Sequence, residues 1–242
     1  LLGFAESNPA LDVEGIDAAN KLVILLAHAY GTMANPLQLP RAGISKIHAT
    51  DAHYAKEKGF KIKLTAQARK LSGGKIAAFV LPQFVQPESQ LYTVRDEFNG
   101  VIIESKLADK QFLYGKGAGR YPTASAVVSD ISALGYDYKY AYKKLHRPEK
   151  NELASNYFLK LFVSFNDQAE VNKWDFEEIT AYHSTAERQY ITGVVSVKKL
   201  VQASWLHDPS VSVILLPNAI VEENTLITGS LKKISLQLAG VN

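Results

Sequence analysis

Residues 13–31 read VEGIDAANKLVILLAHAYG, and this stretch decides the fold expected for the first half of the chain. Asp12 stands just before it as a candidate N-cap, and Glu14 favours the positive end of a helix dipole. Gly31 suits the left-handed position at which helices commonly end. The second half of the stretch is apolar nearly all round, so the sequence predicts one long, buried helix.

Extended segments follow this helix between residues 37 and 110. Their alternating or apolar runs are residues 60–64, 75–81 and 101–103. The dipeptide Asn99-Gly100 predicts a tight turn between antiparallel strands. A short amphipathic helix is expected over residues 51–58, ended by Gly59. Together these elements predict a mixed sheet with helices on one face, in the α+β or α/β fold class.

A glycine-rich turn separates the next two elements. Residues 111–114 (QFLY) predict a buried strand that runs into GKGAG at residues 115–119. A second helix is expected from Thr123, a suitable cap, to Leu134. Residues 136–150 are polar, basic and interrupted by a proline, which indicates a domain boundary.

The last part of the chain has the pattern of strand, short helix, two strands, helix and strand. Its main segments are residues 157–165, 178–182, 189–197, 198–206 and 211–216. This βαββαβ order is the ferredoxin-like arrangement. We therefore expect three units, residues 1–112, 113–149 and 150–242.

Composition excludes several classes of function. The 242 residues contain no cysteine, which excludes disulfide scaffolds, cysteine-ligated zinc, thiol catalysis and iron–sulfur clusters. The net charge of +3 gives little support for nucleic-acid binding. No metal site is expected, because the six histidines include no H-E-x-x-H pair. The longest apolar run, residues 22–27, falls short of the roughly 20 residues that a membrane span needs. We expect a cytoplasmic protein.

Three clusters of residues could carry chemistry, and each has a structural alternative. Asp17 and Lys21, four residues apart on one helix face, are either a solvated ion pair or a proton-donating lysine beside a carboxylate. The glycines of residues 115–119 either allow a ligand to approach the backbone or form a tight turn. Tyrosines and lysines alternate over residues 136–144, which is typical of a base-stacking surface, but an interdomain helix end is the preferred interpretation.

Two of these clusters resemble motifs of one enzyme family. Residues 3–22, GFAESNPALDVEGIDAANKL, resemble the G-[YF]-[AT]-E-x-[DN]-P-x-x-D-x-x-G-x-D-x-x-x-K segment of homoserine dehydrogenase. Residues 117–130, GAGRYPTASAVVSD, resemble that family's G-A-G-x-x-P-T-A-x-x-V-x-x-D segment. The two motifs stand in the right order and at the right distance, and the resemblance covers about residues 1 to 135.

The resemblance implies NAD(P)-dependent interconversion of L-homoserine and L-aspartate 4-semialdehyde, a step of threonine, methionine and isoleucine biosynthesis in the aspartate pathway. It implies that Lys21 is the proton donor or acceptor, with Asp17 supporting the same pocket. Glu6 would hold the substrate ammonium, and Asp12 the polar network at the helix start. Gly117 and Gly119 would lie near the nicotinamide.

The resemblance also implies what this chain does not contain. The family's dinucleotide-binding domain precedes the first motif, so the cofactor, NAD or NADP, would be bound mostly outside this sequence. We therefore expect a C-terminal fragment that alone binds no cofactor and turns over nothing, from an enzyme that forms a homodimer or higher homo-oligomer. Residues 150–242 occupy the place of an ACT domain, but residues 165–171 lack that domain's Pro-Gly turn, so packing or dimerisation is preferred to threonine feedback.

One alternative function stays open. Glu6 and Lys21 could grip the ammonium and the carboxylate of an amino acid in a non-catalytic binding or regulatory module. Substitution of Lys21 would separate the two, because a catalytic lysine affects turnover more than binding.

Overall fold

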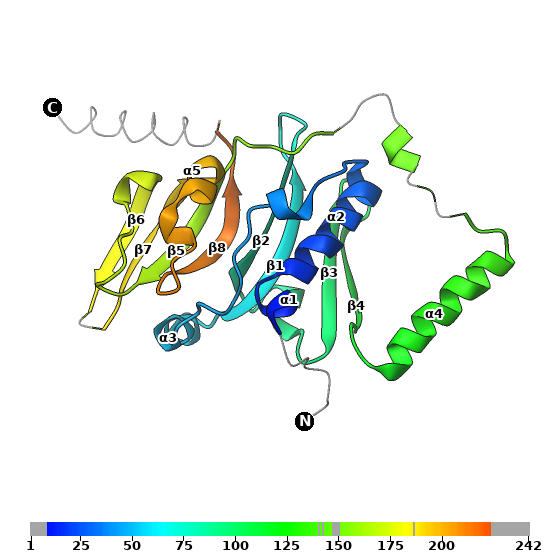
Figure 1. The fold of residues 1–242 in the computed structure, drawn as a ribbon, viewed down its shortest axis with the longest axis horizontal. Coiled ribbons are helices and arrows are strands. Elements are labelled where there is room, and N and C mark those ends of the chain that lie inside the picture. The colour runs from blue at the N-terminus through cyan, green and yellow to red at the C-terminus, as the bar shows by residue number, and fades with distance from the viewer. Residues whose placement is uncertain (1–8, 140, 142, 147–150, 186, 224–242) are drawn as a thin grey trace.

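The computed structural model describes residues 9–139, 141, 143–146, 151–185 and 187–223 (Figure 1). The helices are α1 (Ala10–Val13), α2 (Ile16–Tyr30), α3 (Ala49–Glu57), α4 (Arg120–Gly135) and α5 (Val197–Gln202). The strands are β1 (Lys61–Lys70), β2 (Ile76–Val85), β3 (Phe98–Ser105), β4 (Asp109–Lys116), β5 (Phe158–Phe165), β6 (Phe176–Ser184), β7 (Gln189–Ser196) and β8 (Ser212–Val221). Short 3-10 helices are η1 (Pro36–Gln38), η2 (Gln90–Thr93), η3 (Lys143–His146), η4 (Lys173–Asp175) and η5 (Ser204–Leu206). None of the helices described is both long enough and apolar enough to cross a membrane.

One mixed sheet joins the two halves of the chain, which confirms the predicted mixed α and β class. Its six strands lie in the order β1-β2-β8-β5-β7-β6. The β2–β8 pair, in which Gln83 faces Leu215, is parallel, and the other neighbouring strands are antiparallel. Through this pair, strands predicted for separate units share a single sheet.

The core is divided between the two faces of β2. Its even-numbered side chains, such as Ala78 and Val80, pack against Leu22 and Leu26 of α2. On the same face, Phe84 packs with Ala55 of α3, so both helices cover one face of β1 and β2 as predicted. The odd-numbered side chains of β2 belong to a larger cluster that also contains α5 and η5. Burial on both faces explains why β2 is apolar almost throughout.

The C-terminal strands follow the predicted sequence of elements with one difference. Strands β8, β5, β7 and β6 are neighbours in that order, and α5 precedes β8. The short helix expected between β5 and β6 is only η4, a three-residue 3-10 helix. The ACT-like assignment therefore stays a prediction.

Two expectations for the first helix are wrong. The helix begins at Ile16, after Gly15 in the left-handed conformation (φ 71°), and Asp12 lies in the separate helix α1 instead of capping it. The helix is also buried on one face only: Leu26 is 0% exposed, whereas Leu25 is 47% exposed. Gly31 does end the helix as predicted, with φ 68°.

The region of β3, β4 and α4 differs most from the sequence predictions. Asn99-Gly100 lies within β3, and the hairpin turns at residues 106–108. Gly100 leaves room for a ring, since a Cβ there would lie 2.7 Å from Cε2 of Phe112. Strand β4, predicted to be buried, is almost entirely exposed.

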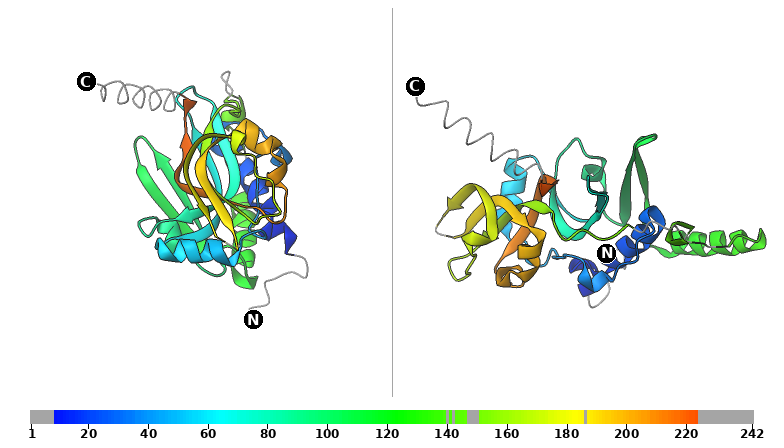
Figure 2. Two further views of the ribbon diagram at one scale, coloured as in Figure 1. Left: turned by 90° about the vertical axis from the view of Figure 1, so that its left-hand side faces the viewer. Right: turned by 90° about the horizontal axis from the view of Figure 1, so that it is seen from above.

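Helix α4 begins at Arg120 after Gly119, so Thr123 is not its cap. The helix has no buried residue. It projects away from the main sheet, as Figure 1 and the right-hand view of Figure 2 show. The apolar stripe predicted for it therefore faces solvent: Val127, Val128, Ile131 and Leu134 are exposed.

Adjacent leucines of α2 test the one-sided burial of this helix. Leu26→Ala should lower the free energy of unfolding of this chain by about 2–5 kcal/mol, because it leaves a cavity against β2. Leu25→Ala is the matched control and should change it by less than about 0.5 kcal/mol. Urea unfolding of the two variants measures both values. Equal destabilisation would show that α2 is buried on both faces.

Candidate functional site

The structure brings Asp17 and Lys21 together on the solvent-facing side of α2. Nζ of Lys21 lies 2.7 Å from Oδ2 of Asp17, one helical turn earlier. The Lys21 side chain is 60% exposed and that of Asp17 is 43% exposed. An ion pair this exposed adds little to stability. Because both side chains are exposed to this extent, both charged groups are accessible to a ligand.

The other acidic residues expected at this site are placed less directly. Asp12 lies exposed in α1, before the turn that leads into α2. Its carbonyl accepts a hydrogen bond from the N–H of Gly15 (3.1 Å). Glu6 lies outside the described residues.

The turn between α1 and α2 is held in place by the sheet. Gly15 is buried, and a Cβ there would lie 3.0 Å from Cγ1 of Val80. A side chain at this position would therefore press on β2 as well as strain the left-handed backbone. The turn sets how α1, which carries Asp12, leads into α2, which carries Asp17 and Lys21.

The glycine-rich turn between β4 and α4 has a local explanation. The N–H of Gly117 donates to the carbonyl of Glu97 (2.8 Å), and a Cβ at Gly117 would collide with the side chain of Asn99. Gly119 has φ 121°, a conformation that L-residues rarely adopt. A tight turn thus accounts for both glycines. Among the described residues, no hydrogen bond or ion pair joins this turn to Asp17 or Lys21.

An ion pair holds the start of this turn. Nζ of Lys116 lies 2.9 Å from Oε1 of Glu97. The hydrogen bond from Lys116 lowers the pKa of the Glu97 carboxyl below its ordinary value.

The basic end of the tyrosine-rich segment packs against the end of α2. Nζ of Lys144, in η3, donates to the carbonyl of Ala29 (2.7 Å). A cation at a helix C-terminus neutralises the negative end of the dipole. This contact favours a helix-end role for the segment.

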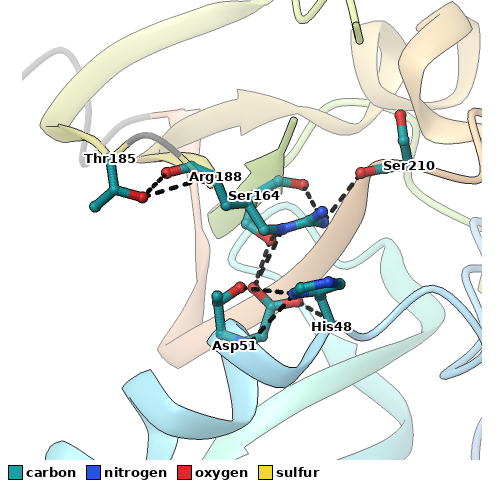
Figure 3. Close-up of polar contacts among 7 residues, drawn as sticks. His48, Asp51, Ser164, Thr185, Arg188 and Ser210 are labelled. Carbon is teal, nitrogen blue, oxygen red and sulfur yellow. Dashed lines mark hydrogen bonds and ion pairs between the residues drawn. The ribbon is translucent and has the colours of Figure 1, made fainter. Parts of the chain in front are cut away.

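A buried polar network was not predicted from the sequence (Figure 3). Asp51 is completely buried and accepts hydrogen bonds from the backbone N–H of His48 (2.9 Å) and from Oγ of Ser164 (2.5 Å). The guanidinium of Arg188 donates to Oγ and the carbonyl of Ser164 and to the carbonyl of Ser210, each at 3.0–3.1 Å. Because α3, β5, the turn before β7 and the loop before β8 each contribute, the network joins the two halves of the chain.

Only one part of that network has a signal in the sequence. His48 and Asp51 have the spacing of a capping box, and the structure forms one. The contacts of Ser164 and Arg188 depend on how the sheet is assembled. Within the described residues, no group of three or more His, Asp or Glu side chains could hold a metal ion.

Comparisons with known proteins identify relatives of this chain. A family model described as homoserine dehydrogenase matches residues 1–132. The chain is 33% identical to the homoserine dehydrogenase of Helicobacter pylori over 234 residues, covering 93% of this chain and 52% of the relative. It is 41% identical to the homoserine dehydrogenase of Lactococcus lactis over 130 residues, covering 54% of this chain and 30% of the relative.

Solved structures extend the similarity over most of the chain. The chain is similar to a homoserine dehydrogenase from Thiobacillus denitrificans, with a TM-score of 0.66, 26% identity and coverage of 88% of this chain and 55% of that one. It is also similar to the S. aureus enzyme at pH 6.0, with a TM-score of 0.60, 28% identity and coverage of 89% and 56%. The chain thus spans about half the length of these structures.

The ion pair between Lys116 and Glu97 makes a pH-dependent contribution to the stability of the fold. Lys116→Met should return the pKa of Glu97 towards its ordinary value of 4.5, as measured by NMR of the side-chain carboxyl. A depressed carboxyl pKa stabilises the fold above the unfolded pKa, and that stability is lost as the pH falls through the folded pKa. Lys110→Met, which breaks the Lys110–Glu104 pair on the same hairpin, should leave Glu97 unchanged. A Glu97 pKa that is the same with and without Lys116 would contradict this account.

Proposed function

Because this chain belongs to the homoserine dehydrogenase family, we propose that it forms the amino-acid side of the site at which L-homoserine and L-aspartate 4-semialdehyde are interconverted. The observation that carries the proposal is the accessible Asp17–Lys21 pair at the start of α2. The pair lies within the stretch that the family model matches.

Lys21 is proposed to move the proton that accompanies hydride transfer. When the aldehyde is reduced, its carbonyl carbon gains a hydride and its oxygen develops alkoxide charge. The Lys21 ammonium donates a proton to that oxygen, which gives the alcohol; in the reverse direction its neutral amine accepts the hydroxyl proton. The Asp17 carboxylate, 2.7 Å away, orients Nζ for this role.

The other acidic residues are proposed to bind the substrate. The amino acid carries an ammonium, so carboxylates at Glu6, Asp12 and Asp17 provide the complementary charge. Such contacts hold the reacting carbon in one position relative to Lys21.

The reaction requires NAD or NADP, which supplies or accepts the hydride. Of this chain's residues, Gly117 and Gly119 would face the nicotinamide half of the cofactor. The glycine-rich turn fits such a group, since it has no side chain at these positions and residue 117 is exposed. The sequence contains no G-x-G-x-x-G run for the pyrophosphate. We therefore infer that this chain by itself does not turn over the substrate.

The remaining assignments follow from the family. We infer a cytoplasmic homo-oligomer that acts in threonine, methionine and isoleucine biosynthesis. The ACT-like C-terminal unit is assigned a packing or dimerisation role.

Substitution of Lys21 separates a catalytic from a purely binding role. In the full-length protein, Lys21→Ala should lower kcat for L-homoserine oxidation about 10²–10⁴-fold, the usual effect of losing a general acid or base. Calorimetry should show L-homoserine binding within a few-fold of wild type. Lys75→Ala, at another exposed lysine, is the control and should change neither kcat nor L-homoserine binding. Equal losses of binding and turnover would support the non-catalytic amino-acid-binding module.

A second assay tests whether this chain alone can turn over the substrate. L-Homoserine-dependent formation of reduced nicotinamide should be measured in parallel on this 242-residue chain and on the protein from its complete reading frame. We expect activity only from the latter, because the chain has no pyrophosphate-binding run of its own. Activity of the chain alone would refute that inference. Inactivity of both with NAD and with NADP would refute the proposed reaction.

A further inference from the structure

Residues 40–46, here called the strap, form a link between the turn before α2 and the C-terminal half of the chain. The strap begins along the edge of β2: the N–H of Val80 donates to the carbonyl of Pro40 (2.9 Å), and the N–H of Ala42 donates to the carbonyl of Val80 (3.0 Å). Its first half is therefore fixed to the centre of the sheet.

The second half of the strap holds the turn that precedes α2. The N–H of Ile44 donates to the carbonyl of Val13 (2.8 Å). A Cβ at Gly43 would lie 2.6 Å from Cα of Glu14, so only glycine allows the two backbones to come this close. The strap thus contacts the turn between Asp12 and Asp17 directly.

Lys46, at the end of the strap, reaches the other half of the chain. Its Nζ donates to the carbonyl of Leu206 at the end of η5 (2.8 Å). Burial lowers the pKa of Lys46, while the nearby carboxylates of Glu14 and Asp208 oppose that change. The Lys46 ammonium thus lies close to Glu14 in the turn before α2 and to Asp208 in the loop before β8.

That loop is itself held in place. Asp208 accepts hydrogen bonds from the backbone N–H (2.8 Å) and Oγ (2.6 Å) of Ser210. The carbonyl of Ser210 accepts from Arg188, whose guanidinium is anchored in the buried network with Asp51 (Figure 3). Lys46 therefore binds to a fixed point.

We propose that Lys46 is a positioning residue for the candidate substrate site: by tying the strap to the loop before β8, it sets the turn between α1 and α2 and hence the placement of Asp12. The proposal rests on the proposed function for its kinetic readout. It predicts an effect on substrate binding more than on proton transfer, because Asp12 lies next to the turn, whereas the Asp17–Lys21 pair lies on α2, which Leu22 and Leu26 anchor to β2.

The test compares three variants of the full-length protein. Lys46→Met keeps the aliphatic stem and removes the ammonium; it should raise KM for L-homoserine about fivefold to tenfold and change kcat less than about twofold. Lys46→Arg restores a cation at the same place and should bring KM back to within about twofold of wild type. Lys75→Met removes an exposed lysine that pairs with Glu152 and is the matched control.

Amide hydrogen exchange gives a second readout that does not need activity. Exchange of the amides of residues 13–20 should be faster in Lys46→Met than in wild type, and unchanged in Lys75→Met. An unchanged KM, equal effects on KM and kcat, or no rescue by arginine overturns the proposal. If the wild-type protein does not act on L-homoserine, the proposed function fails, and the exchange result alone decides whether Lys46 positions the turn.

Discussion

Burial of β2 on both faces is the constraint on which the rest of the structure depends. Residues of α2 pack on one face, and the cluster that contains α5 packs on the other. One edge of the strand pairs with β1 along its length. The other edge is shared by three segments: Ile76 bonds to residues 152–154, Val80 to the strap, and Gln83 pairs with β8. The helix α2, the strap and strand β8 are therefore each positioned relative to this strand.

The buried network of Asp51 and Arg188 adds directional hydrogen bonds to the otherwise apolar contact between α3 and the sheet. Contacts among Ala55, Phe84 and Phe162 bring α3 to the sheet, but hydrophobic contacts do not specify one orientation. The hydrogen bonds of Asp51 do, because a buried carboxylate must keep its partners. Such a network contributes little net stability, yet removal of one partner leaves an unpaired buried charge. It therefore restricts how the two halves of the chain can be assembled.

The sequence predicts elements better than it predicts their surroundings. Gly31, the α3 segment and the C-terminal strands follow from local signals: a helix-ending glycine, a short amphipathic run and apolar alternation. The predicted turn at Asn99-Gly100 fails because Gly100 is needed beneath the Phe112 ring, a contact across the hairpin that local sequence does not reveal. Helix α2 and strand β4 were expected to be buried because they are apolar, but hydrophobic residues also remain on surfaces.

The same limit applies to the candidate site. The spacing of Asp17 and Lys21 predicts their contact, whereas the role of Lys46 depends on chain segments 160 residues apart, Lys46 and Leu206. No local pattern encodes such a pair. The contact could be found only once β2, the strap and the loop before β8 were placed together.

The exposure of Lys21 has a chemical consequence for the proposed reaction. Hydride transfer and the developing alkoxide both require a site from which water is excluded, because fixed charges act more strongly there than in solvent. The side chain of Lys21 is 60% exposed, so for the proposed reaction this face of α2 would be one wall of such a site. The same face continues into Ile24 and Leu25, which are exposed and apolar. A charged pair beside an apolar surface is what a covering wall would need: the apolar part binds the cover, and the ion pair then lies in a drier environment. The proposed proton transfer would therefore require this face of α2 to be covered.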